Sequence, residues 1–214
     1  MASDNIVNAA EGAILVASVL PQEETVSGAN TGYAPVNGLR MYYEIHGEGQ
    51  PLILVHGTLG STDTFAGIMP ELSQNRKVIL VDLQGHGRTT DIDRPLGFSS
   101  FADDIAAFMQ FLEIQKADLM GYAMGGMVAL RTAIQHPEMV DRLVVVSSTF
   151  SRDGWYPEII KGMSSMGAST AEQLRQTPMY ENYIHGAPRP EDWTVLCSKL
   201  GVLGNQDYNW SAEV

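Results

Sequence analysis

One six-residue stretch has the spacing of a chemical motif but lacks its reactive group. Gly121-Tyr122-Ala123-Met124-Gly125-Gly126 follows the pattern Gly-x-Ser-x-Gly, which places a nucleophile where a strand turns sharply into a helix. The flanking glycines let the backbone turn this tightly without side-chain collisions. The central residue is Ala123, which has no hydroxyl. The motif therefore predicts a nucleophile position without a nucleophile.

The segments on either side of Ala123 favour this setting. Ala117–Met120 is a short apolar run typical of a buried strand. Residues Met127–His136 are predicted to form a helix, which Pro137 ends.

Alternating strand and helix signals begin at Tyr33. Asn37-Gly38 predicts a hairpin turn between two strands, and three further apolar runs predict buried strands. The five predicted strands are Tyr33–Val36, Leu39–His46, Pro51–Val55, Lys77–Val81 and Leu143–Val146. With Ala117–Met120, this alternation predicts an α/β fold: a mostly parallel sheet flanked by helices.

Two helices are expected between these strands. Apolar residues at helical spacing predict the first over 65–72, where Pro70 splits or delays it. Ser100, with Asp103 three residues later, predicts the start of the second, whose apolar stripe reaches Leu112.

The composition and the secondary-structure signals change after residue 150. Residues 151–205 contain helical segments rich in methionine and aromatic residues, and no clear strand. We expect a helical cap that covers the carboxyl edge of the sheet, where open α/β sheets bind ligands. Residues 33–150 would form the core, and residues 206–214 would return toward it.

Bulk composition limits the partners. The 214 residues carry a net charge of −12, which repels nucleic acids and anionic membranes. Cys197 is the single cysteine, so an internal disulfide is excluded. One domain is the default for this length.

Residues 1–32 are expected to form an N-terminal arm or a leader. The apolar run Ala13–Leu20 is long enough for a signal-peptide core but too short to span a bilayer, and no positive charge precedes it. Both a cytoplasmic and an exported location stay open.

Three loops together resemble the α/β-hydrolase family over nearly all of residues 33–214. They are His56-Gly57-Thr58-Leu59-Gly60-Ser61, Asp82-Leu83-Gln84-Gly85-His86-Gly87-Arg88 and the stretch around Ala123, each after an apolar strand. The likeness is to esterase-like members with a helical cap after the sixth strand.

The resemblance implies an oxyanion hole built from two backbone N–H groups. The matching residues are Met124 and Thr58, with Leu59 as the alternative to Thr58. Met124 also begins a predicted helix, whose dipole would favour negative charge there. Backbone donors survive side-chain changes, so the hole is expected to persist with Ala123.

His56 and His86 invite a metal interpretation together with Asp82. Their glycine-bracketed loops favour hydrogen bonds that hold the loops instead, and no metal or organic cofactor is expected. His185, in the expected cap, is interpreted as a structural or surface residue.

The resemblance also implies a triad acid and a histidine nearer the C-terminus. No residue here matches that histidine, and Asp153 is only a weak candidate acid. We expect a fragment, with the remainder cleaved or supplied by another polypeptide; a natural minimal protein is the alternative. The sixth strand would then be a bare sheet edge.

Ala123 has two explanations, deliberate replacement of serine or natural decay into a binding protein. Backbone strain at this turn has no chemical benefit once the hydroxyl is absent, and glycine at this position would relieve the strain. The presence of alanine rather than glycine therefore favours a recent replacement of serine. Aspartate here would mark a relative of dehalogenases or epoxide hydrolases, but Tyr122, Met124 and Gly126 fit the serine type better.

Two functional hypotheses follow. The first is a serine hydrolase of carboxylic esters or lactones in disabled form, with Leu59, Tyr122, Met127 and Trp155 lining an apolar pocket for a small apolar ester-like substrate. The second is a non-catalytic small-molecule binder on the same scaffold.

Overall fold

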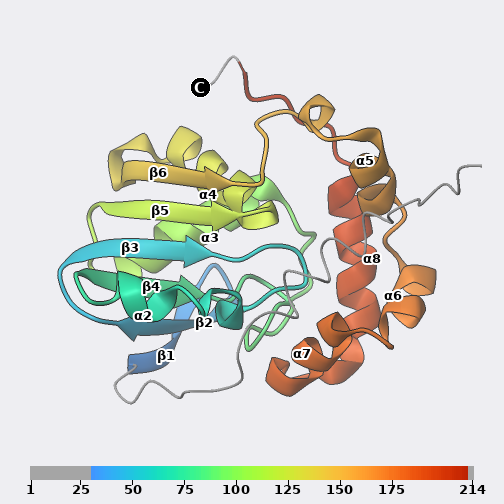
Figure 1. The fold of residues 1–214 in the computed structure, drawn as a ribbon, viewed down its shortest axis with the longest axis horizontal. Helices are drawn as coiled ribbons and strands as arrows, with labels where there is room; N and C mark the ends of the chain where they lie inside the picture. The colour runs from blue at the N-terminus through green and yellow to red at the C-terminus, as the bar shows by residue number, and fades with distance from the viewer. Residues whose placement is uncertain (1–29, 212–214) are drawn as a thin grey trace, which may run out of the picture.

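A six-stranded sheet forms the centre of the molecule in the computed structural model, which describes residues 30–211 (Figure 1). The strands are β1 Asn30–Val36, β2 Leu39–His46, β3 Gln50–Val55, β4 Arg76–Val81, β5 Ala117–Tyr122 and β6 Val140–Val146. Their spatial order is β1-β2-β4-β3-β5-β6. The neighbouring strands β4, β3, β5 and β6 run parallel to one another. The pairs β1–β2 and β2–β4 are antiparallel. The predicted mostly parallel sheet is confirmed.

The hairpin turns where Asn37-Gly38 predicted it. Both residues have positive φ angles, 46° and 85°, which asparagine and glycine tolerate. β1 begins at Asn30 rather than at Tyr33, and residues 30–32 pair with β2. The expected arm of residues 1–32 is therefore wrong for its last three residues, and the rest of it lies outside the described part.

β6 differs from its prediction as a buried strand. Among the described strands it pairs only with β5, and the side chains of Val144 and Val145 are 48% and 38% exposed. An apolar run alone does not reveal whether a strand has a neighbour on each side. Within residues 30–211, β6 is thus an edge strand of the sheet, as expected from the sequence.

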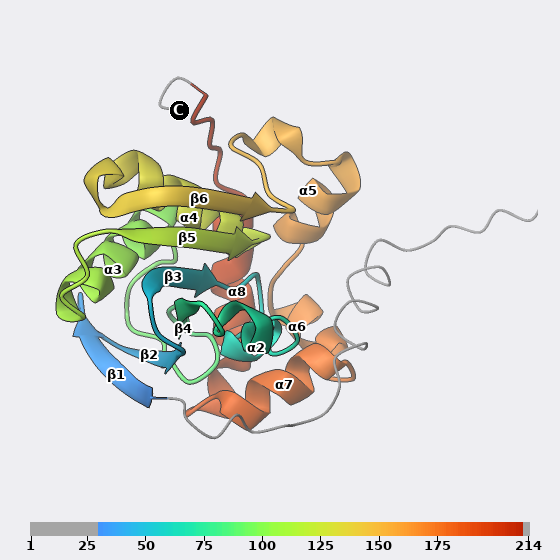
Figure 2. The same cartoon turned by 60° about the vertical axis from the view of Figure 1, so that its left-hand side comes forward.

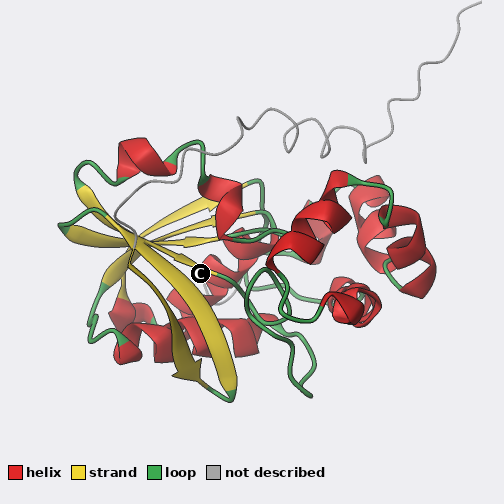
Figure 3. Cartoon of the chain, turned by 90° about the horizontal axis from the view of Figure 1, so that it is seen from below, coloured by secondary structure: helices red, strands yellow, loops and turns green. Residues whose placement is uncertain are grey.

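Helices cover both faces of the sheet (Figure 3). α3 (Phe98–Phe111) and α4 (Met124–Gln135) pack together on one face, over the larger apolar core. The short elements η1 (Thr62–Phe65) and α2 (Met69–Leu72) lie over a smaller cluster, with the predicted break near Pro70 between them.

Two helix starts were misplaced. α3 begins at Phe98 after Gly97, which makes no side-chain cap, so the capping box predicted at Ser100 is wrong. α4 begins at Met124, one turn before the predicted start at Met127, because Ala123 itself is its N-cap residue.

Four helices follow β6 and stand beside the sheet (Figures 1 and 2). They are α5 Pro157–Ser164, α6 Ala168–Leu174, α7 Pro178–Gly186 and α8 Trp193–Gly204, with the short turns η3 Arg152–Gly154 and η4 Pro190–Asp192. A further short turn, η2 Pro137–Met139, lies earlier in the chain, between α4 and β6. The arrowheads of β3, β5 and β6 point toward these helices (Figure 1). This is the arrangement expected of a cap at the carboxyl edge.

The chain after α8 runs back toward the sheet domain. Ser151 and Asn209 form an isolated antiparallel bridge, and the rings of Tyr208 and Trp210 pack against Phe98 of α3. In the described part of the chain, no helix is long and apolar enough to cross a membrane.

Candidate active site at the strand–helix elbow

Ala123 occupies a strained turn. Its φ and ψ angles are 50° and −118°, a backbone conformation that residues other than glycine rarely adopt. Its N–H donates to the carbonyl of Val146 at 2.9 Å, which ties the turn to the end of β6. The Ala123 side chain is partly exposed rather than buried in the core. A side chain at this position therefore stands at the end of β5, directly before α4.

The glycines of the motif are required by close backbone contacts. A Cβ atom on Gly121 would collide with the carbonyl of Gly125, and one on Gly125 would collide with the carbonyls of Val55 and His56. Gly126 faces Ser148, whose Cβ would lie 2.7 Å from an added Cβ. The α4 N-terminus is thereby pressed onto the ends of β3 and β6.

The loop after β3 reaches the same turn. A Cβ atom on Gly57 would lie 3.2 Å from the Cβ of Ala123. Gly60 N–H donates to the Gly57 carbonyl at 3.1 Å, and Leu59 has a φ of 58°. Thr58, at the tip of this turn, is exposed.

Two amide groups at this junction lack acceptors within residues 30–211. Among residues 30–211, no acceptor is found for the backbone N–H of Thr58 or of Met124. Met124 is the first residue of α4, where the helix macrodipole places roughly half a positive charge. Unused N–H groups beside such a charge are suited to bind an oxyanion.

His56 fixes the loop that carries Thr58. Its Nε2 accepts from Leu83 N–H at 3.1 Å, so Nδ1 bears the proton and donates to the Gly57 carbonyl at 2.8 Å. Burial lowers the pKa of His56 to about 3, and the His86 ring, 5.1 Å away, adds to this shift. His56 is thus a neutral cross-link between two loops, unable to act as a base.

His86 and Asp82 hold the loop after β4. His86 Nδ1 donates to the carbonyl of Gln84 at 2.9 Å, and burial lowers the pKa of His86 to about 4. Asp82 accepts from the backbone N–H groups of Thr62 and Arg88, both at 2.7 Å, while burial raises its pKa to about 7. The interpretation of these residues as loop-holding is confirmed.

The other three histidines have partners of their own. His46 Nε2 lies 3.1 Å from Glu44, and His136 Nε2 lies 2.9 Å from Asp103. His185 is exposed on α7, and its Nδ1 donates to the carbonyl one helical turn earlier. None of the five histidines in the chain is paired with a group at position 123.

Comparison with known proteins agrees with this geometry. The model of the alpha/beta hydrolase fold family matches residues 50–188. The chain belongs to the α/β-hydrolase family.

Two relatives of this α/β-hydrolase chain carry the names of enzymes with different activities. It is 32% identical over 154 residues to the sn-1-specific diacylglycerol lipase ABHD11 of Danio rerio, covering 67% of this chain and 48% of the relative. It is 30% identical over 190 residues to a soluble epoxide hydrolase of Corynebacterium sp. (strain C12), covering 85% of this chain and 61% of the relative. A solved membrane phospholipase A superposes with a TM-score of 0.68 at 21% identity, covering 94% and 71% of the two chains, which shows a shared fold.

The α/β-hydrolase chain spans only part of these proteins. It covers 34% of the length of Mycobacterium proteins that are 32% identical to it over 116 residues, and 48% and 61% of the two enzymes above. Activity, substrates and partners are therefore matters for proposal.

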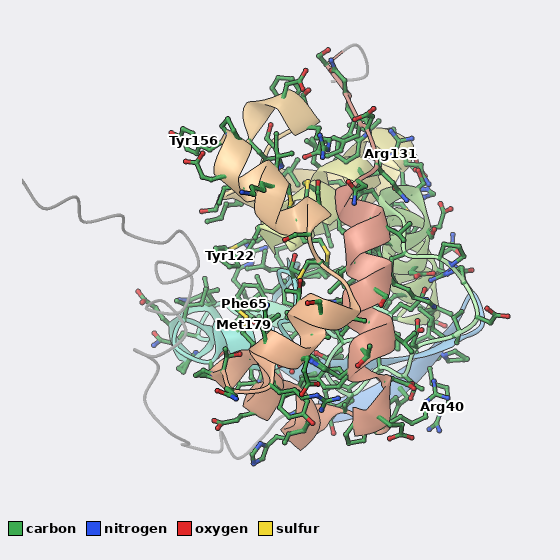
Figure 4. All side chains as sticks on the ribbon, turned by 90° about the vertical axis from the view of Figure 1, so that its right-hand side faces the viewer. Arg40, Phe65, Tyr122, Arg131, Tyr156 and Met179 are labelled. Atoms are coloured by element: carbon green, nitrogen blue, oxygen red, sulfur yellow. The ribbon has the colours of Figure 1, made fainter. Side chains whose placement is uncertain are left out.

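The residues predicted to line a substrate pocket divide between two packing environments. Leu59 and Met127 are buried in the larger core, and Trp155 packs against it while donating to the Tyr208 hydroxyl at 2.7 Å. Tyr122 packs against the smaller cluster on the other face of the sheet. Figure 4 views the molecule from the side of α5 to α8 and labels Tyr122 below α5 and above α7 in that view. The lining role of these four residues stays a prediction.

A surface cavity of about 470 Å³ lies elsewhere in the α/β-hydrolase chain, along α3. It is lined by Asn37, Arg94, Ser99, Ser100, Asp103, Ala106, Ala107, Gln110 and His136. Its charged groups already pair with one another or with neighbours, as His136 does with Asp103. None of the predicted site residues lines it.

One strained residue near the site escaped prediction. Ser147, directly after β6, also has a φ of 50°. It follows Val146, whose carbonyl accepts the Ala123 N–H. Serine is not a residue that marks a positive φ angle, so the sequence held no signal for this second turn.

Proposed function

We propose that this chain is a disabled form of a hydrolase of carboxylic esters or lactones, with position 123 as the nucleophile site. The observation that carries the proposal is the positive φ of Ala123 at the N-terminus of α4. Strain of this kind persists where it serves a reaction, and it gives no benefit to an alanine methyl.

The mechanism assigns a role to each group at the turn. With serine at position 123, its Oγ attacks the acyl carbon while a base takes the proton, and the carbonyl oxygen becomes an oxyanion. The N–H groups of Thr58 and Met124 bind that oxyanion. The tetrahedral intermediate then expels the alcohol and leaves an acyl-serine for water to hydrolyse. Loss of one donor would cost about 3–4 kcal/mol of transition-state stabilisation.

The base is not a histidine of the loops. His56 has both ring nitrogens engaged and a pKa of about 3, and His86 has a pKa of about 4. We assign no acid or base among residues 30–211. An external imidazole can therefore stand in for the base in an experiment.

A second candidate is epoxide hydrolysis. The relative that covers 85% of this chain is named a soluble epoxide hydrolase, and a carboxylate at position 123 would suit that reaction. The neighbours Tyr122, Met124 and Gly126 favour the serine type. The lipase name of the 32% identical relative also agrees with an ester substrate.

Two variants distinguish the candidates. Ala123→Ser and Ala123→Asp are each incubated with imidazole and either p-nitrophenyl butyrate or styrene oxide, with the unchanged chain as control for direct reaction with imidazole. The ester proposal predicts release of nitrophenol above the control by Ala123→Ser alone. Opening of the epoxide by Ala123→Asp, with no ester cleavage by Ala123→Ser, would overturn it. Binding of the ester without turnover by any variant would favour the non-catalytic binder.

A further inference from the structure

Lys199 connects the helices beyond the sheet to the loop after β4. It lies on α8, and its ammonium group donates to Asp91 Oδ2 at 2.6 Å, Ile92 O at 2.7 Å and Arg94 O at 2.9 Å. An ammonium group has three N–H donors, so all of them are used on one short segment. The side chains of Lys199 and Asp91 are 22% and 8% exposed, so water competes little for this contact.

The other oxygen of the same carboxylate continues the chain of bonds. Gln84 Nε2 donates to Asp91 Oδ1 at 2.7 Å and to the Arg94 carbonyl at 2.9 Å. Gln84 is fully buried, and its Oε1 accepts two bonds from Arg94, which in turn pairs with Asp104 at 2.6 Å. The Gln84 side chain is therefore held from both ends. Because each buried group already has its partners, moving one leaves another unsatisfied.

The backbone at Gln84 carries the connection to the elbow. Its carbonyl accepts from His86 Nδ1, and the N–H of the preceding Leu83 donates to His56 Nε2. His56 Nδ1 then donates to the carbonyl of Gly57, the residue on which an added Cβ atom would lie 3.2 Å from the Cβ of Ala123. An unbroken run of bonds thus leads from α8 to the loop of Thr58.

Apolar packing supports the same junction. Gly85 has a φ of 75°, and a Cβ atom there would lie 3.2 Å from Leu196 Cδ1 on α8. Arg189, before η4, donates to the Asp91 carbonyl at 2.9 Å. α8 therefore rests directly on the segment that positions His56.

We propose that Lys199 is a positioning residue that couples the seating of α8 to the geometry of the Gly57–Thr58 turn. The alternative is a local latch, which holds α8 to residues 91–94 and affects nothing further. Two groups are coupled when disturbing one alters the other beyond its own contacts. The catalytic consequence, an oxyanion donor placed correctly only when α8 is seated, rests on the proposed function.

The test uses the unchanged Ala123 chain and reads the imidazole N–H of His56 and the amides of Gly57 and Thr58 by NMR. Lys199→Met removes the charge and the donors at similar length. Lys161→Met makes the same change on an exposed lysine of α5 and is the matched control. Coupling predicts that Lys199→Met shifts the Gly57 and Thr58 amides and speeds exchange of the His56 N–H about two- to thirtyfold, while Lys161→Met does neither.

Two further variants complete the design. Lys199→Arg keeps the charge and is expected to return these signals toward those of the parent. Asp91→Asn, a smaller change, replaces Lys199→Met if that variant does not fold, with the same expected shifts. Changes confined to residues 91–94 and α8 in a folded variant would overturn the coupling. The readout involves no turnover, so inactivity of Ala123→Ser would refute the proposed function and leave this result intact.

Discussion

Gly57 and Ala123 meet so closely that a Cβ atom on Gly57 would lie 3.2 Å from the Cβ of Ala123. The contact joins the loop after β3 to the turn after β5, although 66 positions separate the two residues in the sequence. Since Thr58 follows Gly57 and Met124 follows Ala123, their N–H groups are carried by adjoining turns.

The strain at Ala123 predicts that glycine is better there. Ala123→Gly should raise the free energy of unfolding by about 1 kcal/mol, because glycine adopts a φ of 50° and a ψ of −118° without steric cost. Ala133→Gly, in the last turn of α4, should lower it by up to about 1 kcal/mol. Urea unfolding measures both. Equal destabilisation by the two changes would mean that position 123 is not strained.

Replacement by alanine should change the stability of the protein in opposite directions at two glycines. Gly125→Ala places a methyl against the carbonyls of Val55 and His56, so the variant should be destabilised by at least about 3 kcal/mol or not fold. Gly162→Ala, in α5, meets no atom within 4 Å and should stabilise by about 0.5–1 kcal/mol. Circular dichroism during thermal unfolding compares them. A well-folded, unaltered Gly125→Ala variant would contradict the packing of α4 on β3.

The elbow could be read from the sequence because its requirements are local. The spacing of Gly121, Ala123 and Gly125 specifies a tight strand–helix turn by steric rules alone, and Asn37-Gly38 specifies its hairpin in the same way. The length and apolar pattern of the strands before the three motif loops were enough to predict those strands and loops. These features depend on neighbours a few residues apart.

The remaining features depend on contacts between distant segments. The Lys199 contact with Asp91 spans 108 residues, and no local pattern marks it. The exposure of Val144 on β6 depends on which strands lie beside it, and the start of α3 at Gly97 was hidden by a plausible cap at Ser100.

Stability should fall in acid through the buried histidines. The pKa of His86 is about 4 when folded and about 6.5 when unfolded, so between these values the unfolded chain binds a proton that the folded chain does not. His86 thus lowers the free energy of unfolding by up to about 1.4 kcal/mol per pH unit as the pH falls from 6.5 to 4.

The variant His86→Gln isolates this effect. The pKa of Asp82, raised by burial to about 7, gives the opposite slope, but Asp82 is present in both proteins and cancels in their difference. Urea unfolding at a series of pH values should show the parent losing stability relative to His86→Gln below pH 6.5. Parallel curves would show that His86 is accessible to protons in the folded state.

Labelling at position 123 tests the central claim most directly. Ala123→Ser is incubated with p-nitrophenyl butyrate and imidazole, and the acyl group is located by peptide mapping and mass spectrometry. The strained turn with its two amide donors predicts one butyryl group on Ser at position 123 and none at that peptide in the Ala123 chain. Absence of acylation at position 123 in a folded variant, or acylation no greater than at partly exposed Ser61 and exposed Ser147, would contradict the account.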